Sequence, residues 1–278
     1  PVPSIDFNHC MAKLLLNNQE YYFELTSKYL PFRSIYTSSL NSIMLDIGGD
    51  AGQGSIKYLN PATRKQNMIS RAVNITMKDK DFVVDENTYK TASLAGNLRE
   101  VYKDLSQKDQ IKKIKEAIAG QYPDNDINQL SFQNMDNSNS DTVYMKLNYS
   151  LKNSTKDIAG LSIFSMPWSD KFTPSDFQII LPRVTGIDIS QMFYMDNETE
   201  TITLTLPAGK KMVEGPKPVT INSDIIDYSM IPRVSGNKLI MTRTFKLKKD
   251  FVPVEKAAEF DALFKKMVDA DNKEFAMK

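Results

Sequence analysis

The sequence predicts a mainly β protein with a minor α component: an antiparallel β-sandwich that carries a helical insert and a C-terminal helix. Apolar and polar residues alternate along several runs, as half-buried antiparallel strands require. Two neighbouring stretches in the middle of the chain and one at its end repeat their apolar residues at helical spacing instead. With 278 residues, of which 41% are hydrophobic, the chain can bury a core without covalent cross-links.

The strand prediction rests on four runs in which apolar residues recur at every second position, interrupted in the last run by Arg243. They are residues 73–77, 143–151, 202–206 and 239–247. Shorter runs of the same kind predict further strands at 127–132, 161–164, 177–181, 192–195 and 219–226. This density of short strands is typical of β-sandwiches.

Three segments have helical periodicity. The first runs from Leu94 to Leu105. The second opens at Ser106, which together with Asp109 resembles an N-terminal cap, and it ends at Gly120. The third covers about 254–271, and its apolar face predicts a C-terminal helix packed on a sheet.

Two breaks in the pattern divide the chain into three predicted domains. Residues 48–54 are too rich in glycine for a regular element, and Met166-Pro167-Trp168-Ser169-Asp170 separates strand-like runs. We therefore predict an N-terminal unit at 1–54, a β-rich unit with the helical insert at 55–165, and a second β-rich unit with the terminal helix at 166–278. The start at Pro1 suggests a processed or excised chain.

Composition excludes several classes of function. Lys and Arg number 35 against 34 Asp and Glu, so the sequence has no cationic surplus for nucleic acid. A single Cys and a single His exclude a disulfide framework, a Cys/His zinc site and a paired-cysteine redox centre. No apolar run reaches the length of a membrane span. We expect no cofactor and no metal.

One constellation carries chemistry. Two apolar runs near the N-terminus are hinged at Asn17-Asn18, a pair typical of a tight hairpin turn. That register places His9 opposite Thr26 and makes Glu24 its diagonal neighbour on the same face, at about 7–8 Å between backbones. A carboxylate so placed fixes the imidazole tautomer and favours the imidazolium, which is the role of the third member in a Cys-His-acid triad.

These residues resemble the second half of a bacterial transglutaminase-like (papain-like) core. In that family a His opens one strand, and after a tight turn an aromatic strand ends in a motif like Tyr-Trp-Leu-Asp-Pro-Thr. The matching run here is Tyr21-Tyr22-Phe23-Glu24-Leu25-Thr26. The resemblance implies that His9 takes the place of the catalytic His and Glu24 that of the catalytic Asp.

The later sequence is similar to the uncharacterised β-rich domain that follows this core in proteins of the Bacteroidetes type. Its features are an Arg-led strand at Arg71, a phrase Leu204-Thr205-Leu206-Pro207-Ala208-Gly209, and a closing strand with Arg243 that leads to a C-terminal helix. The resemblance implies that this chain is the C-terminal part of a cell-envelope protein that is periplasmic or extracellular. It implies two partners, the missing N-terminal half of the core and an envelope protein or peptide substrate.

The chain departs from that family in two ways. Glu24 is one methylene longer than Asp, and the nucleophilic Cys expected upstream of the His is not in this chain. Cys10 cannot replace it, because strand neighbours point to opposite faces, and we expect Cys10 to be a small buried hydrophobe. The leading interpretation is therefore an inactive fragment of a thiol hydrolase or acyltransferase that serves scaffolding or recognition. The alternative is a non-catalytic β-sandwich module that binds a cell-envelope protein or glycan.

Overall fold

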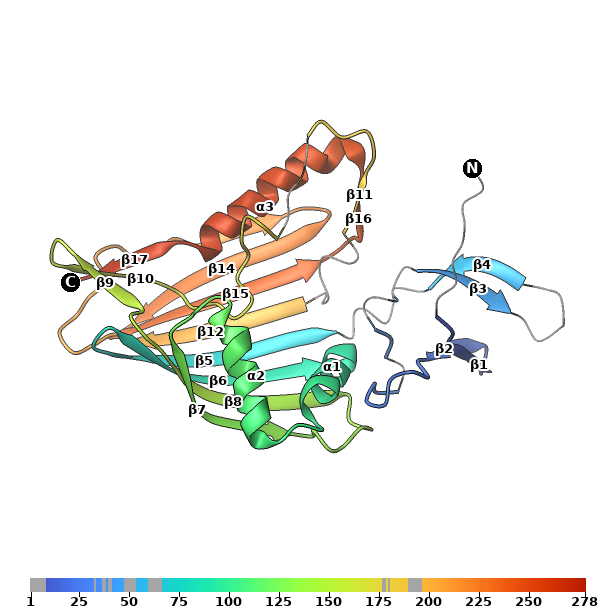
Figure 1. The fold of residues 1–278 in the computed structure, drawn as a ribbon. Coiled ribbons are helices and arrows are strands. Elements are labelled where there is room, and N and C mark those ends of the chain that lie inside the picture. The colour runs from blue at the N-terminus through green and yellow to red at the C-terminus, as the bar shows by residue number, and fades with distance from the viewer. Residues whose placement is uncertain are drawn as a thin grey trace.

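The computed structural model of the protein describes residues 9–32, 34–36, 39, 42–47, 54–59, 67–176, 179, 181–189 and 197–278. This part of the chain is mainly β, with one large, mostly antiparallel sheet and a C-terminal helix, which confirms the predicted fold class. Figure 1 shows helix α3 lying across the large sheet and two small hairpins beside one end of it.

The large sheet has eight strands in the order β13-β14-β15-β12-β5-β6-β8-β7. All neighbours are antiparallel except β12 and β5, which are parallel. The strands are β5 (Met68–Lys78), β6 (Asp81–Thr91), β7 (Asn125–Gln133), β8 (Thr142–Leu151), β12 (Asn197–Thr205), β13 (Val219–Asn222), β14 (Ile226–Ser235) and β15 (Lys238–Leu247). The β12–β5 pair joins strands from both predicted β-rich units into one sheet.

Register follows from the alternation seen in the sequence. Ile202 of β12 lies opposite Met241 of β15 on one side and opposite Val73 of β5 on the other. All three side chains are buried. Because the side-chain period of a strand is two, this row fixes which face of the whole sheet meets the core.

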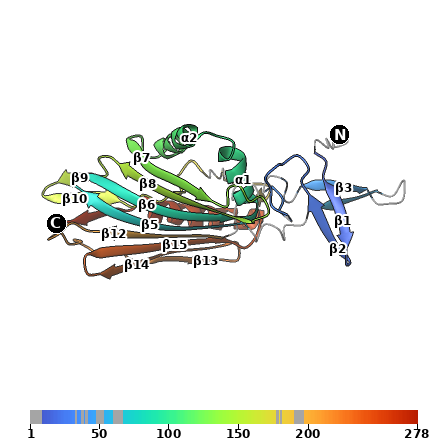
Figure 2. The same ribbon diagram turned by 90° about the horizontal axis from the view of Figure 1, so that it is seen from below.

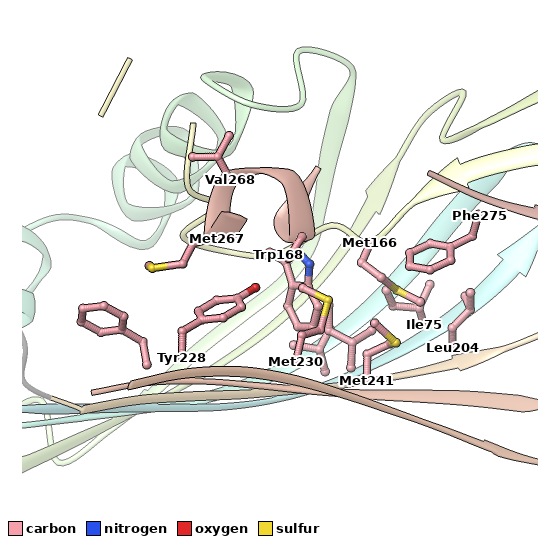
Figure 3. Close-up of a cluster of buried hydrophobic side chains, with 14 of the residues drawn as sticks. Ile75, Met166, Trp168, Leu204, Tyr228, Met230, Met241, Met267, Val268 and Phe275 are labelled. Atoms are coloured by element: carbon pink, nitrogen blue, oxygen red, sulfur yellow. The ribbon is translucent and has the colours of Figure 1, made fainter. Parts of the chain in front are cut away.

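The second layer over that face consists of helices and a small sheet. Helix α3 (Ala257–Asp271) follows a short 3₁₀ turn, η3 (Val254–Lys256), and a three-stranded sheet lies beside it. Figure 3 shows Trp168 between the sheet and α3, next to Met230 and Met241. The remaining strands are β9 (Thr155–Ile158), β10 (Leu161–Ser165) and β17 (Glu274–Met277) in the small sheet, and the pair β11 (Ile187–Asp188) and β16 (Phe251–Val252).

The helical insert forms as predicted. Helices α1 (Ala92–Tyr102) and α2 (Gln107–Ala119) join β6 to β7, and Figure 2 shows them together on one side of the sheet. The Ser106 hydroxyl accepts a hydrogen bond from the Asp109 amide at 3.2 Å, which confirms the predicted cap. Ile114 of α2 is buried in the main core.

The shorter runs had mixed outcomes. Residues 127–132 lie within β7 and 161–164 lie within β10. Residues 219–226 contain β13, which ends at Asn222, and the first residue of β14, Ile226. Residues 192–195 and most of 177–181 lie outside the described residues, as do 48–53 of the glycine-rich break.

Two hairpins form the N-terminal part. One pairs β1 (Ala12–Leu16) with β2 (Gln19–Phe23), and the other pairs β3 (Ile43–Ile47) with β4 (Gly54–Tyr58). They share a small core of Ile35 and Leu59, against which Met11, Tyr22 and Met44 pack. The hairpins therefore meet through one face each.

Among the described residues, no helix has both the length and the apolar character needed to cross a bilayer.

Candidate functional site

The turn of the first hairpin sets the register of the candidate site. Asn17 and Asn18 have φ of 53° and 61°, the left-handed pair that a two-residue hairpin turn requires. Leu16 lies opposite Gln19, and the pairing continues to Ala12 opposite Phe23. The predicted hairpin and its register are confirmed from Leu16 to Ala12, but the ladder ends there, so the predicted pairing of His9 with Thr26 does not form.

His9 and Glu24 are in direct contact. The His9 Nε2 and Glu24 Oε2 atoms lie 2.6 Å apart. The Glu24 side chain is fully buried, whereas that of His9 is 38% exposed. The other carboxylate oxygen, Oε1, accepts hydrogen bonds from the Thr26 amide at 3.0 Å and the Thr26 hydroxyl at 2.6 Å. The carboxylate is thus held from both sides, and the imidazole remains open to solvent.

These contacts define the protonation chemistry of the pair. Burial disfavours the Glu24 carboxylate, but the hydrogen bonds from Thr26 and His9 outweigh it and lower the pKa of Glu24. An ionised Glu24 that accepts from Nε2 keeps the proton on that nitrogen. Nδ1, which forms no hydrogen bond with a described residue, is then the nitrogen that can take a proton from a third group.

Cys10 does not behave as predicted. It is exposed, not buried. It lies before the first residue of β1, where no neighbouring strand covers it. The expectation that it is a small buried hydrophobe is wrong, because its burial depended on a strand continuing through residue 10.

Charged side chains link the two hairpins. Asp46 of β3 binds Lys13 and Lys57, with each N···O distance at 2.5 Å. Lys57 also reaches Glu20 of β2 at 3.0 Å. Hydrogen bonds from both lysines lower the pKa of Asp46. The pairs are solvent-accessible and each stabilises little, but together they link all four strands of the two hairpins.

The segment after Glu24 contacts helix α1 and the two residues that follow it. The Tyr29 hydroxyl donates to Asp104 at 2.6 Å, and the ammonium groups of Lys28 and Lys103 lie 4.8 and 4.9 Å from the centre of its ring. Gly96 permits the contact, since a β-carbon there would lie 3.0 Å from Leu30 Cδ1. The position of the His9 hairpin therefore depends on the β-rich part of the chain.

A second constellation lies inside the large sheet and was not found from the sequence. Arg243 of β15 donates to Glu198 at 3.2 Å, to Glu200 at 3.0 Å and to Asp271 of α3 at 2.6 Å. Arg71 of β5 binds Glu198 as well. These five side chains are almost completely buried.

The network also holds the segment between β10 and β11. The Ser169 hydroxyl donates to Glu200 at 2.9 Å, and the Phe172 amide donates to Asp271 at 3.0 Å. Arg71 binds the Asp170 carboxylate, which is the one partly exposed acid of the group. Trp168 packs over Arg243, whose guanidinium carbon lies 4.9 Å from the centre of the indole. Sheet, α3 and this segment are thus tied at one point.

Burial and charge oppose each other within the network. Burial raises the pKa of Glu200 to about 7 against the pull of Arg243 and Arg71. Burial also opposes ionisation of Asp170, but the nearby cations of Arg71 and Lys90 outweigh it and hold the pKa of Asp170 at about 2. Since every acid in the network is hydrogen-bonded, we interpret the network as structural, holding α3 and the sheet together, and not as a reaction centre.

A signal for the network did exist in the sequence. Glu198 and Glu200 lie at even spacing from Ile202 on β12, so their side chains point to the same inward face of the sheet. Arg71 is related to Val73 on β5 in the same way. A charged residue at an inward position of a strand needs a partner of opposite charge there. Among the described residues, no group of three or more His, Cys, Asp or Glu side chains could hold a metal ion.

Comparisons with known proteins give limited matches. Residues 183–277, which contain β11 to β17 and α3, match a family described as a domain of unknown function with a solved structure (DUF3858). A crystal structure of a "putative protease" from Parabacteroides distasonis aligns with 96% of this chain at 13% identity and a TM-score of 0.36. The chain spans 35% of that protein. No curated protein matches this sequence.

Proposed function

We propose that this chain is the C-terminal part of a transglutaminase-like cysteine protease or acyltransferase. In this proposal His9 and Glu24 are two members of its thiol triad, and the β-rich part serves scaffolding or recognition. The observation that carries the proposal is the 2.6 Å contact between His9 Nε2 and a buried Glu24, whose second oxygen is held by Thr26. A solvent-facing imidazole oriented by a buried carboxylate is the arrangement of a general base.

The chemistry assigned to the pair is proton transfer at Nδ1. A thiol supplied by the upstream half of the core gives its proton to Nδ1, and Glu24 stabilises the imidazolium that forms. The thiolate attacks a peptide carbonyl, and the leaving amine takes the proton back from Nδ1 as the thioester forms. Water or a second amine then releases the acyl group. Without that thiol the present chain is expected to be inactive.

The exposed outer face of the first hairpin is consistent with a further segment that packs on it. Leu14 and Leu16 are 43% and 51% exposed there, and Phe32 is 62% exposed while stacked on Tyr21. A two-stranded hairpin is marginally stable alone, and a contiguous apolar face of this kind is typical of a surface that another segment covers. We assign that cover to the upstream half of the core.

The test uses the full-length gene product and a biotinylated peptide vinyl sulfone, which labels an activated thiol. We expect labelling of the full-length protein and a loss of about 10²–10⁴-fold in rate for His9→Gln, because the base is removed. Glu24→Gln should lose less, since it can still accept from Nε2. Lys108→Gln, on the exposed side of α2, is the matched control and should label normally. Equal labelling of wild type and His9→Gln would contradict the proposal.

A cell-envelope location belongs to the same proposal. Fractionation of the native bacterium with an antibody to this chain tests it, and a cytosolic signal contradicts it.

A non-catalytic binding module is the second candidate. It is favoured by Tyr89 and Tyr144, which lie opposite each other on the open face of the sheet with ring centres 5.9 Å apart. Aromatic side chains paired at the surface can stack on a sugar ring. Tyr144→Ala should weaken binding of a cell-envelope glycan in this case and leave thiol labelling of the full-length protein unchanged.

A further inference from the structure

In the described part of the chain, no strand pairs with the outer edge of β13, the last strand of the large sheet. β13 pairs with β14 on one side and ends the strand order on the other, as Figure 2 shows. The Ser223 amide donates to the Ile226 carbonyl, so the hydrogen-bonded pairs that alternate from there are Ile221 with Tyr228 and Val219 with Met230. The backbone N–H and C=O groups of Thr220 and Asn222 therefore point away from β14.

A groove runs between this edge and helix α3. Its volume is about 490 Å³, within the range of ligand-binding clefts. Strand β13 forms one wall. The other carries Leu263, Lys266 and Ala270, which follow one side of α3 at helical spacing, and Lys273, just after the end of the helix. An open strand edge facing a helix across a groove is the arrangement by which some domains take an extended peptide as an added strand.

The helical wall gives the groove a preference for charge. Lys266 and Lys273 are exposed and form no ion pair with any residue in the described part of the chain. The one acidic residue lining the groove is Asp269. Two unpaired ammonium groups against one carboxylate favour an occupant with acidic side chains, while Leu263 and Ala270 offer it apolar contact.

We propose that this groove binds an extended acidic peptide segment, which pairs with Thr220 and Asn222 as an additional strand of the sheet. The backbone of β13 supplies affinity for any extended chain, and Lys266 and Lys273 select acidic residues at alternate positions. The inference goes beyond the thiol chemistry proposed above, because it uses no residue of the N-terminal hairpins and holds whether or not the parent protein is an enzyme.

The probe is a fluorescein-labelled peptide of about seven residues that alternates valine and glutamate, titrated with the full chain and followed by fluorescence anisotropy. Two further versions carry N-methyl groups on the valine amides or on the glutamate amides. Only one set of amides can face β13, so one version should lose binding by at least about tenfold while the other keeps it. Equal binding of both versions would overturn the proposal, as would no binding of the parent peptide at about 1 mM.

Variants locate the binding. The double variant Lys266→Glu, Lys273→Glu should bind the glutamate peptide roughly tenfold more weakly and a lysine version of it more tightly. Lys108→Glu with Lys113→Glu, on exposed positions of α2, is the matched control and should change neither affinity. Unchanged affinity in the groove variant would place the peptide elsewhere and refute the assignment.

Thr220→Pro removes the outward N–H at an edge position where proline is tolerated, and it should abolish binding. If that variant does not fold, hydrogen exchange on the wild type decides: the amides of Thr220 and Asn222 should be protected by the peptide and those of Ile221 unchanged. Failure of that protection overturns the proposal. So does a stable dimer in sedimentation that Thr220→Pro dissociates, because a second copy would then occupy the edge.

Discussion

Replacing Arg243 with methionine removes the cation at the centre of the buried network. Methionine is similarly long and apolar, so it can still pack under Trp168 and the change is mainly electrostatic. Arg243 donates hydrogen bonds to the carboxylates of Glu198, Glu200 and Asp271 at 2.6–3.2 Å. It also donates to the Asp170 carbonyl at 3.0 Å. Breaking a buried ion pair by removing one partner costs about 3–5 kcal/mol.

The expected loss is therefore about 3–5 kcal/mol of unfolding free energy near pH 8, a large part of the 5–15 kcal/mol typical of a domain. Urea unfolding measures it through the fluorescence of Trp168, the only tryptophan in the chain, which is buried beside Arg243. Arg233→Met is the matched control, because Arg233 is exposed on β14, and it should change stability by less than about 0.5 kcal/mol.

A double variant separates charge from packing. Glu200→Gln neutralises one of the acids that Arg243→Met leaves without its cation, so the double variant should be more stable than the sum of the single effects by about 1–2 kcal/mol. A loss below about 1 kcal/mol for Arg243→Met, or additive effects in the double variant, would refute the view that the network fastens α3 to the sheet.

Three further predictions follow from the same contacts. The pKa of Glu200 is about 7 in the folded state and about 4.5 in the unfolded state, so its contribution to stability is complete below pH 4.5 and is lost by about 3 kcal/mol as the pH rises through 7; urea titrations of Glu200→Gln should lack this slope. Thr26→Val removes a donor to Glu24 and should raise the pKa of that carboxyl, measured by ¹³C NMR, whereas an unchanged value would contradict the assigned hydrogen bond. Gly96→Val should displace Leu30 and speed hydrogen exchange across residues 27–32 without changing the large sheet, and unchanged exchange there would show that this contact does not hold the hairpin.

The hairpin and the helices could be predicted because short-range sequence signals determine them. The Asn17-Asn18 turn fixes the register of the hairpin by itself, so His9 and Glu24 could be predicted to lie close together without any tertiary information, although the ladder ends at Ala12 and Phe23 before it reaches them. The helix caps and the apolar faces of the helices also depend only on residues close together in the sequence.

The prediction failed where an inward position is polar. Strand β6 was missed because Glu86 and Thr88 occupy two of its inward positions and hide its alternation. The buried acids of β12 were missed for the same reason, since apolar alternation was the only strand signal used. Their partners come from distant segments, as with Glu198 and Arg71, and a single sequence does not show which strands will be neighbours.

The parallel pairing of β5 with β12 sets a condition on synthesis. Met68 has no lateral partner on that side until Asn197 and the residues after it have left the ribosome. Until then this long strand edge is unpaired, and Arg71 on it lacks Glu198, one of the acids that bind it. Such a delay favours association between nascent chains. The order in which the segments emerge, and not only their final contacts, therefore governs how safely this protein reaches its native state.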